Sequence, residues 1–316
     1  MVFPSEFPVK TVSHVYGPVH SRRLGLSLGV DLIPFKTCPL DCIYCQLGPT
    51  TKKTLRRANY VPVDRVLEDL KRSLEEFPEP DFITLAGSGE PTLHSGIGEI
   101  ITRIRTVSSR PVAILTNGVL LGDEDVKNSC RLADVIVPSL DAGNEGEYAR
   151  VNRPARGLTL RSLVDGLAGF REGFSGEIWL EVFLVRGVTD NDDTVKKIAR
   201  QACLIRPDRV HLNTAVRPTA EDSVFPVSFP ELERFAAFFS PEAQIAFDQP
   251  SEKEMPGVTE EKLTESLKRR PATIEEISAI LQLSPVQVTK MVDRMVRKNR
   301  IRVVRRQGAV HYTALP

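Results

Sequence analysis

The sequence predicts an α/β protein, a partial (β/α)6 barrel of the TIM type followed by a small winged helix-turn-helix domain. Short apolar runs alternate with amphipathic segments of helical period through about residue 250. Polar, glycine-rich segments follow the apolar runs directly, as they do at the carboxyl ends of parallel strands. Beyond residue 257 the alternation stops and the chain becomes basic. These observations predict a domain at 1–250, a linker at 251–260 and a second domain at 261–316.

The predicted elements alternate along the chain. The first half has strands at 24–34, 81–87 and 111–118, and helices at 62–77, 96–107 and 123–133. The second half has strands at 134–141, 176–187, 208–214 and 243–247, and helices at 159–173, 192–205 and 229–239. Strands separated by helices form parallel sheets. A doubly wound open sheet has the same order of elements, so closure of the sheet into a barrel stays open.

The C-terminal segment has local signals for two capped helices and a hairpin. Thr273 and Glu276 have the spacing of a capping box. Ser284 followed by Pro285 is a typical helix start, and a helical segment at 259–270 precedes both. Two strands are expected about Gln307-Gly308. This order is that of a winged helix-turn-helix.

The same segment is positively charged. From Gly257 onward it has 12 Lys and Arg against 6 Asp and Glu, although the whole chain has a net charge of only +1. The expected recognition helix and wing carry basic side chains that suit phosphate contacts: Lys290, Arg294, Arg297, Lys298, Arg302, Arg305 and Arg306. Nucleic-acid binding is therefore one hypothesis, and a protein-binding or packing module is the other.

The N-terminal residues and the hydropathy of the chain predict a cytoplasmic protein. No apolar run near the start resembles a signal peptide, and no stretch is long enough to cross a membrane. Cysteines stay reduced in that compartment, so a tight cysteine cluster indicates metal binding or chemistry rather than disulfides.

Three cysteines lie within eight positions in the segment CPLDCIYC, at Cys38, Cys42 and Cys45. A structural zinc site needs a fourth ligand, for which His14, His20 or His94 is available. Ferredoxin clusters also use four thiolates. Three thiolates can instead hold three irons of a cubane cluster and leave the fourth iron open for a ligand. Cys130 and Cys203 stand alone in helical segments and are expected to be buried apolar residues.

The CxxxCxxC spacing, with Tyr44 before the last cysteine, resembles the signature of the radical S-adenosylmethionine (SAM) superfamily. The segment GSGEPTL follows the next predicted strand and resembles the GGEP motif of that superfamily. The resemblance implies that Cys38, Cys42 and Cys45 hold a [4Fe–4S] cluster. It also implies that residues of this motif, Gly87, Gly89 and Glu90, contact the amino group of SAM.

Further SAM contacts are implied at the ends of later strands. Asn117 in TNG, together with Ser139 and Asp141 in SLD, resembles segments near the ribose and the methionine carboxylate, and Val185 would border the adenine. The alternative for the two tripeptides is ordinary helix capping and turn chemistry. The segment from Val15 to Phe247 resembles a subgroup akin to wyosine-synthesis and molybdenum-cofactor-synthase enzymes.

The resemblance implies an enzyme that cleaves SAM reductively and abstracts hydrogen from a substrate, with an electron from flavodoxin or ferredoxin. RNA, in particular tRNA, is one substrate hypothesis, and a small metabolite or peptide is the second. A regulator that senses cluster occupancy and binds nucleic acid is the alternative of another class. No catalytic residue is assigned, and no membrane partner is expected.

Each of several other polar residues has two alternative interpretations. Arg22 and Arg23 could clamp an anion or form a solvated pair, and Arg150 with Arg153 could line a substrate mouth or a charged loop. His211 and Asn213 alternate on one strand and therefore face one side, with Arg217 just beyond. His211 could equally be a satisfied core histidine.

Overall fold

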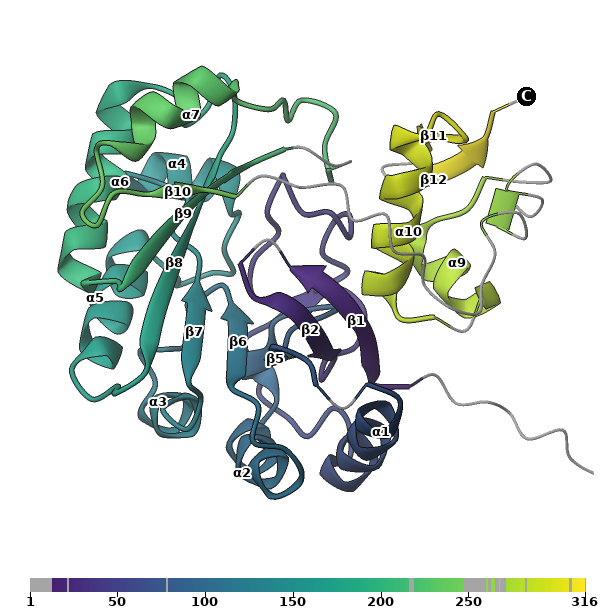
Figure 1. The fold of residues 1–316 in the computed structure, drawn as a ribbon. Coiled ribbons are helices and arrows are strands. Elements are labelled where there is room, and N and C mark those ends of the chain that lie inside the picture. Colours follow the sequence, from purple (N-terminus) through teal and green to yellow (C-terminus); the bar gives the residue numbers. More distant parts are fainter. Residues whose placement is uncertain are drawn as a thin grey trace, which may run out of the picture.

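The computed structural model describes residues 13–21, 23–77, 79–215, 219–246, 260, 263–264, 267, 271–281, 283–306 and 309–315. An eight-stranded sheet with the order β1-β2-β5-β6-β7-β8-β9-β10 forms its centre (Figure 1). Its strands are β1 Val15–Ser21, β2 Gly25–Val30, β5 Phe82–Leu85, β6 Val112–Thr116, β7 Val135–Pro138, β8 Glu177–Leu184, β9 Arg209–Thr214 and β10 Gln244–Ile245. Every pair from β2 to β10 is parallel. The prediction of an α/β fold with a mostly parallel sheet is confirmed.

The N-terminal edge differs from the prediction. Strand β1 pairs antiparallel with β2, with a register shift between Tyr16 and Val19. The sequence signal for this strand is weak because Gly17 and Pro18 interrupt it, and proline inside a strand is tolerated at edges. In the described part of the chain, β1 and β10 stand at the two ends of the strand order, so the sheet is open there.

The helices follow the strands in the expected alternation. They are α1 Val63–Glu76, α2 Ile97–Val107, α3 Glu124–Cys130, α4 Glu145–Val151, α5 Leu160–Arg171, α6 Asp192–Ile205 and α7 Phe229–Ala236, with a 3-10 turn η1 at Pro91–Leu93. Helix α4 was not predicted, since only two of its seven residues, Tyr148 and Val151, are buried. A two-stranded ribbon, β3 Thr37–Cys38 with β4 Lys52–Lys53, carries the first cysteine.

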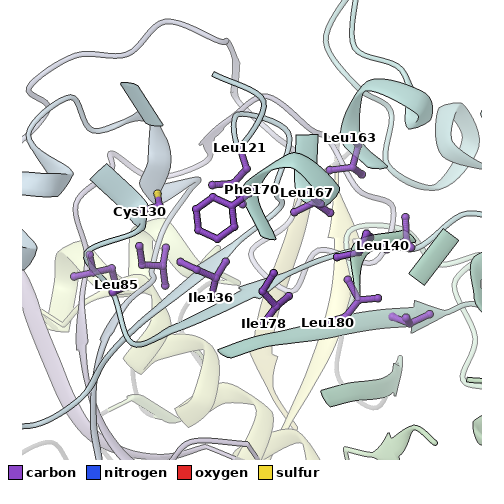
Figure 2. Close-up of a cluster of buried hydrophobic side chains, with 14 of the residues drawn as sticks. Leu85, Leu121, Cys130, Ile136, Leu140, Leu163, Leu167, Phe170, Ile178 and Leu180 are labelled. Atoms are coloured by element: carbon purple, nitrogen blue, oxygen red, sulfur yellow. The ribbon is translucent and has the colours of Figure 1, made fainter. Parts of the chain in front are cut away.

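The main core lies between one face of the sheet and the helices. Alternate strand residues such as Leu85, Ile136 and Leu180 are fully buried against helical side chains such as Phe170 and Leu167 (Figure 2). Cys130 on α3 belongs to this core, as predicted. Strand residues of period two thus fill one face with aliphatic side chains, and the intervening residues face the other side.

The opposite face of the sheet mixes apolar and polar side chains. Trp179, Val135 and Val137 form a small cluster on it. Asn213 donates to Glu181 across 2.9 Å, and Arg23 forms an ion pair with the same carboxylate. The His211 ring meets the Trp179 ring in an edge-to-face arrangement, with a centroid distance of 5.9 Å and an interplanar angle of 66°. The alternation of His211 and Asn213 therefore places both on this face, whereas Arg22 and Arg217 lie outside the described residues.

The prediction for Cys203 was wrong, because the structure leaves this cysteine exposed. The buried face of α6 contains Val195, Ile198 and Ala202. Cys203 follows Ile198 by five residues, which places the two side chains on different sides of a helix with 3.6 residues per turn.

In the described residues, no helix is both long and apolar enough to cross a membrane.

The C-terminal elements are helices α9 Ile274–Leu281 and α10 Pro285–Arg297 and the antiparallel hairpin β11 Ile301–Arg306 with β12 Ala309–Ala314. The expected capping box at Thr273 with Glu276 is present, and the expected N-cap Ser284 forms a second capping box with Gln287. These elements have a core of their own and lie beside the β1 end of the sheet (Figure 1). The expected linker at 251–260 lies outside the described residues, apart from Glu260.

Candidate functional site

The loop that carries the three cysteines, residues 38–45, is called the cysteine loop. It begins at the end of β3 and is hydrogen-bonded to the end of helix α4. Asp41 N–H donates to the Asn152 carbonyl at 2.9 Å, and Ile43 N–H donates to the Val151 carbonyl at 3.0 Å. Within the loop, Cys45 N–H donates to the Cys42 carbonyl at 3.1 Å. The position of the three cysteines therefore depends on a helix more than 100 residues away in the sequence.

All three cysteines are free thiols, and each sulfur lies beside at least one N–H donor. Cys38 Sγ accepts from Leu40 N and from Asn117 Nδ2, each at 3.5 Å. Cys42 Sγ accepts from Asn152 Nδ2 at 3.4 Å, and Cys45 Sγ accepts from Lys36 Nζ at 2.9 Å. Burial raises the pKa of Cys38 to about 12 and also raises that of Cys42. N–H groups around sulfur stabilise the thiolate form that iron requires.

This donor set fits an iron–sulfur cluster. In the described residues, no three or more His, Cys, Asp or Glu side chains are placed so that together they could hold one metal ion. In a cubane cluster each thiolate binds a different iron, so its three ligands do not converge on one point. His94, one of the alternative zinc ligands, is engaged elsewhere: its Nε2 lies 2.9 Å from the Val61 carbonyl oxygen.

The GSGEP segment runs directly beside the first cysteine. Lys36 N–H donates to the Ser88 carbonyl at 2.7 Å, and Glu90 N–H donates to the Thr37 carbonyl at 3.1 Å. A Cβ at Gly89 would overlap the Thr37 carbonyl oxygen, and one at Gly87 would overlap the Asp31 carboxylate. Gly89 is therefore required by the close approach of the Thr37 backbone, and Gly87 by the close approach of the Asp31 side chain.

Replacing Gly89 by alanine is expected to lower the unfolding free energy by about 2–3 kcal/mol, because the obstacle is backbone and cannot rotate away. Gly122 is the matched control, since a Cβ there has its nearest neighbour at 3.8 Å. Gly122→Ala should change stability by less than about 0.5 kcal/mol. Urea denaturation of both variants measures the difference, and equal midpoints would contradict the explanation.

Glu90 joins the GSGEP segment to the TNG segment. Its Oε1 accepts from Thr92 N at 3.1 Å and from the Thr92 and Thr116 hydroxyls at 2.6 Å, while Oε2 accepts from Asn117 N at 2.8 Å. Burial raises the pKa of Glu90, and these donors oppose that rise. The carboxylate is thus largely occupied within the protein. It orients Asn117, whose side-chain amide reaches Cys38.

Asp31, at the carboxyl end of β2, was not among the predicted site residues. It accepts from Ser88 N at 3.0 Å, from the Ser88 hydroxyl, and from Ile33 N at 3.3 Å. It therefore holds the GSGEP segment at its second residue. Its place after a parallel strand was a signal that could have found it.

The burial of Asp31 predicts a pH dependence of stability. Burial raises the pKa of Asp31 from 3.8 to about 6, so the folded chain binds this proton more tightly than the unfolded chain does. The unfolding free energy should therefore fall as pH rises from about 4 to about 6, by up to roughly 3 kcal/mol from this group. Urea denaturation across that range, in the original protein and in Asp31→Asn, isolates the contribution. A variant with an unchanged slope would contradict it.

Asp141 lies at the centre of the site. It accepts from the Tyr44 hydroxyl, from Asn152 Nδ2 at 2.8 Å and from Phe183 N at 3.0 Å. Burial raises its pKa to about 6. The carboxylate thus ties the cysteine loop to the end of α4 and to β8. Asn152 was not predicted, and nothing in its local sequence distinguishes it.

The remaining predicted residues lie around Asp141. The Tyr44 ring stacks on Phe183 with a centroid distance of 4.0 Å and an interplanar angle of 10°. Val185 is fully buried in the same apolar cluster, with Ile43. Ser139 extends the pairing of β7 with β8 through a bridge to Glu181. The structure therefore brings the cysteine loop and the GSGEP, TNG and SLD segments to one edge of the sheet.

The C-terminal elements reach this edge. Phe35 and Leu47 lie on either side of the cysteines in the sequence. Both pack against the hydrophobic core of the C-terminal elements. Arg305 donates to the carbonyls of Thr219 and Ala220, at 2.8 and 2.5 Å, and pairs with Asp222. A cavity of about 410 Å³ lies where these parts meet. It is lined by Asp41, Cys42, Pro49, Arg153, Ala220, Glu221, Asp222, Ser223 and Arg305.

A family model described as the radical SAM superfamily matches residues 32–199, a range that contains the three cysteines and the GSGEP, TNG and SLD segments. The chain belongs to the radical SAM superfamily. The resemblance inferred from the cysteine spacing is thereby confirmed. Radical SAM enzymes use a [4Fe–4S] cluster and SAM, and they require an electron donor.

Two curated relatives are similar to this chain over most of its length. A UPF0026 protein of Methanocaldococcus jannaschii is 33% identical over 232 residues, which cover 71% of this chain and 70% of the relative. A Brachyspira hyodysenteriae protein named GTPase Obg is 36% identical over 303 residues. That match covers 94% of this chain but 45% of the relative, so the chain spans less than half of that protein's length.

The fold of this chain is also seen in a solved structure. TYW1 with a bound lysine–pyruvate adduct aligns with a TM-score of 0.52 over 69% of this chain and 74% of TYW1, at 16% sequence identity. A likeness at this identity shows the fold alone. The family model, rather than this likeness, assigns the chain to the radical SAM enzymes.

Proposed function

We propose that Cys38, Cys42 and Cys45 hold the [4Fe–4S] cluster of this radical SAM enzyme. The observation that supports this is the N–H donor or ammonium beside every one of the three sulfurs. When bound, the cluster and SAM supply reductive cleavage of the sulfonium to methionine and a 5′-deoxyadenosyl radical that abstracts hydrogen from the substrate. The chain's own residues position these groups and exclude water.

SAM is proposed to lie between the four segments at the carboxyl edge of the sheet. Gly87 and Gly89 let the GSGEP backbone pack on Asp31 and Thr37 beside the first cysteine, and Glu90 orients Asn117 toward the cysteines. The half-exposed Ser139 offers a hydroxyl, and Asp141 holds Tyr44 in place. Tyr44, stacked on Phe183, contributes an apolar wall of the kind that an adenine ring packs on, and the fully buried Val185 supports this wall from behind.

Anaerobic reconstitution with iron and sulfide tests this assignment. The expected result is one cluster per chain that becomes EPR-active on reduction, and release of 5′-deoxyadenosine when SAM and a reductant are added. Zinc in the cysteine loop, or a reduced cluster that never cleaves SAM, would refute it.

We further propose the partial TIM-type barrel as the catalytic domain and the C-terminal elements as a winged helix-turn-helix packed on it. The mixed polar face of the sheet, with Glu181, His211 and Asn213, would line the substrate space. Flavodoxin or ferredoxin is the proposed electron donor.

The ion pairs of the C-terminal elements favour a small metabolite or peptide as substrate over RNA. Glu260 pairs with Arg294 and Arg300, each at 2.7 Å, and Asp293 pairs with Arg297 at 3.1 Å. These intramolecular pairs partly neutralise the helix face expected to contact phosphates. The cavity beside Cys42 has the size of a small-molecule site, and its walls carry both signs of charge.

A tRNA titration decides between the two substrate classes. Phosphate contacts make the affinity fall steeply between about 50 and 200 mM salt. We expect weak binding without a steep salt dependence. Tight, salt-sensitive binding that weakens in Arg302→Ala would instead establish RNA as the substrate class, since Arg302 is exposed on β11.

A further inference from the structure

Lys36 is a buried lysine beside the cysteine loop. Its relative exposure is 4%, and it adopts a left-handed backbone conformation with φ of 53°. Its N–H donates to the Ser88 carbonyl at 2.7 Å, and its carbonyl accepts from Lys52 N at 3.1 Å. The GSGEP segment and β4 therefore hold this backbone from both sides, which fixes the side chain against the cysteines.

The ammonium group of Lys36 has a sulfur as its partner. Nζ lies 2.9 Å from Cys45 Sγ, and in the described part of the chain no carboxylate forms a salt bridge with it. A buried ammonium is costly without a negative partner. The thiolates of the cysteine loop are the negative groups available to it.

A cation at this place has a definite consequence for electron transfer. Reduction by one electron makes a thiolate-ligated cluster more negative by one charge. Hydrogen bonds to the sulfurs, net charge and burial set the reduction potential of such clusters. A buried positive charge interacts with the added electron through a medium of low dielectric constant, where charges are poorly screened. The cation therefore stabilises the reduced state more than the oxidised state.

We propose that Lys36 is a positioning residue that raises the reduction potential of the cluster through its charge-assisted N–H···S bond to Cys45. This inference rests on the proposed assignment of the cluster to Cys38, Cys42 and Cys45. Lys36 makes the cluster easier for a one-electron donor to reduce, and the bond to Cys45 keeps the ammonium in place.

The test is an EPR-monitored redox titration of the reconstituted protein with dithionite, in the absence of SAM. Lys36→Met is expected to shift the reduction equilibrium at least about tenfold toward the oxidised cluster, which is about 59 mV for one electron. Lys36→Arg should retain most of the original potential. Lys53→Met is the matched control, since Lys53 is exposed on β4 and its ammonium donates to the Arg153 carbonyl.

A Lys36→Met protein that carries a full cluster at the original potential would overturn the inference. So would a variant whose only change is weaker SAM binding, because Lys36 would then be a SAM contact. If Lys36→Met does not assemble a cluster, Lys36→Gln decides in the same way. Failure of both neutral variants to load, with Lys36→Arg loaded, shows a purely structural role and also overturns it. Absence of a cluster in the original protein would instead refute the underlying assignment.

Discussion

Replacing Cys42 by alanine is expected to abolish cluster binding and with it SAM cleavage. Cys42 lies at the centre of the cysteine loop, and its sulfur accepts from Asn152 Nδ2 at 3.4 Å. Two thiolates cannot hold the cluster with one open iron, so 5′-deoxyadenosine release should fall by more than about 1,000-fold, or roughly 4 kcal/mol in barrier height. Iron and sulfide analysis with chromatography of the nucleoside products measures both losses.

The control for this experiment is Cys203→Ala, because Cys203 is an exposed cysteine on α6. It removes a thiol without touching the site, so iron content and SAM cleavage should stay at the original level. A Cys42→Ala protein that retains a complete cluster and cleaves SAM would show that another residue provides the third ligand.

Replacing Asp141 by alanine is expected to destabilise the apo-protein by about 2–4 kcal/mol. The change leaves three buried donors without their acceptor: the Tyr44 hydroxyl, Asn152 Nδ2 and Phe183 N. Part of the loss is offset because a carboxylate, whose pKa burial raises to about 6, no longer has to be buried. Urea denaturation at neutral pH gives the magnitude.

Two further variants sharpen the Asp141 experiment. Asp141→Asn keeps the shape and one acceptor oxygen, so its cost should be smaller, about 1–2 kcal/mol. Asp165→Ala removes an exposed carboxylate that pairs with Arg161 on the surface of α5 and should cost less than about 0.5 kcal/mol. Equal losses in Asp141→Ala and Asp165→Ala would mean that the buried contacts of Asp141 contribute little.

Most elements of the fold could be predicted because their signals are local. Helix α1 buries Val66, Leu67 and Leu70 at helical spacing, and strand β5 is a short apolar run of β-branched character. The starts of the two C-terminal helices are determined by capping residues within the same turn. Two of the elements that were missed, β1 and α4, have weak local patterns. Their stability comes from pairing with β2 and from contacts with the cysteine loop.

Of the candidate site, only the sequence motifs could be predicted, and the contacts between them could not. The cysteine spacing and the GSGEP segment identify the chemistry, since few other functions need three thiolates so close together. The sequence did not indicate that Glu90 is occupied by four protein donors, or that Asp31 holds Ser88. Those contacts join residues from separate strands, so no spacing along the chain could reveal them.

By itself, the sequence determined most of the order of strands and helices, the superfamily and the three cysteines, because periodicity, caps and short motifs act between near neighbours in the chain. Only the tertiary structure decided that Asp141 and Asn152 support the cysteine loop, that Lys36 directs a buried cation at Cys45, and that Arg305 brings the C-terminal elements to the cavity beside Cys42. The physical reason is that burial and hydrogen bonding depend on which segments meet in space. The folded sheet and its helices bring together groups that are far apart in the sequence, for example Cys42 and Asn152, which are 110 residues apart.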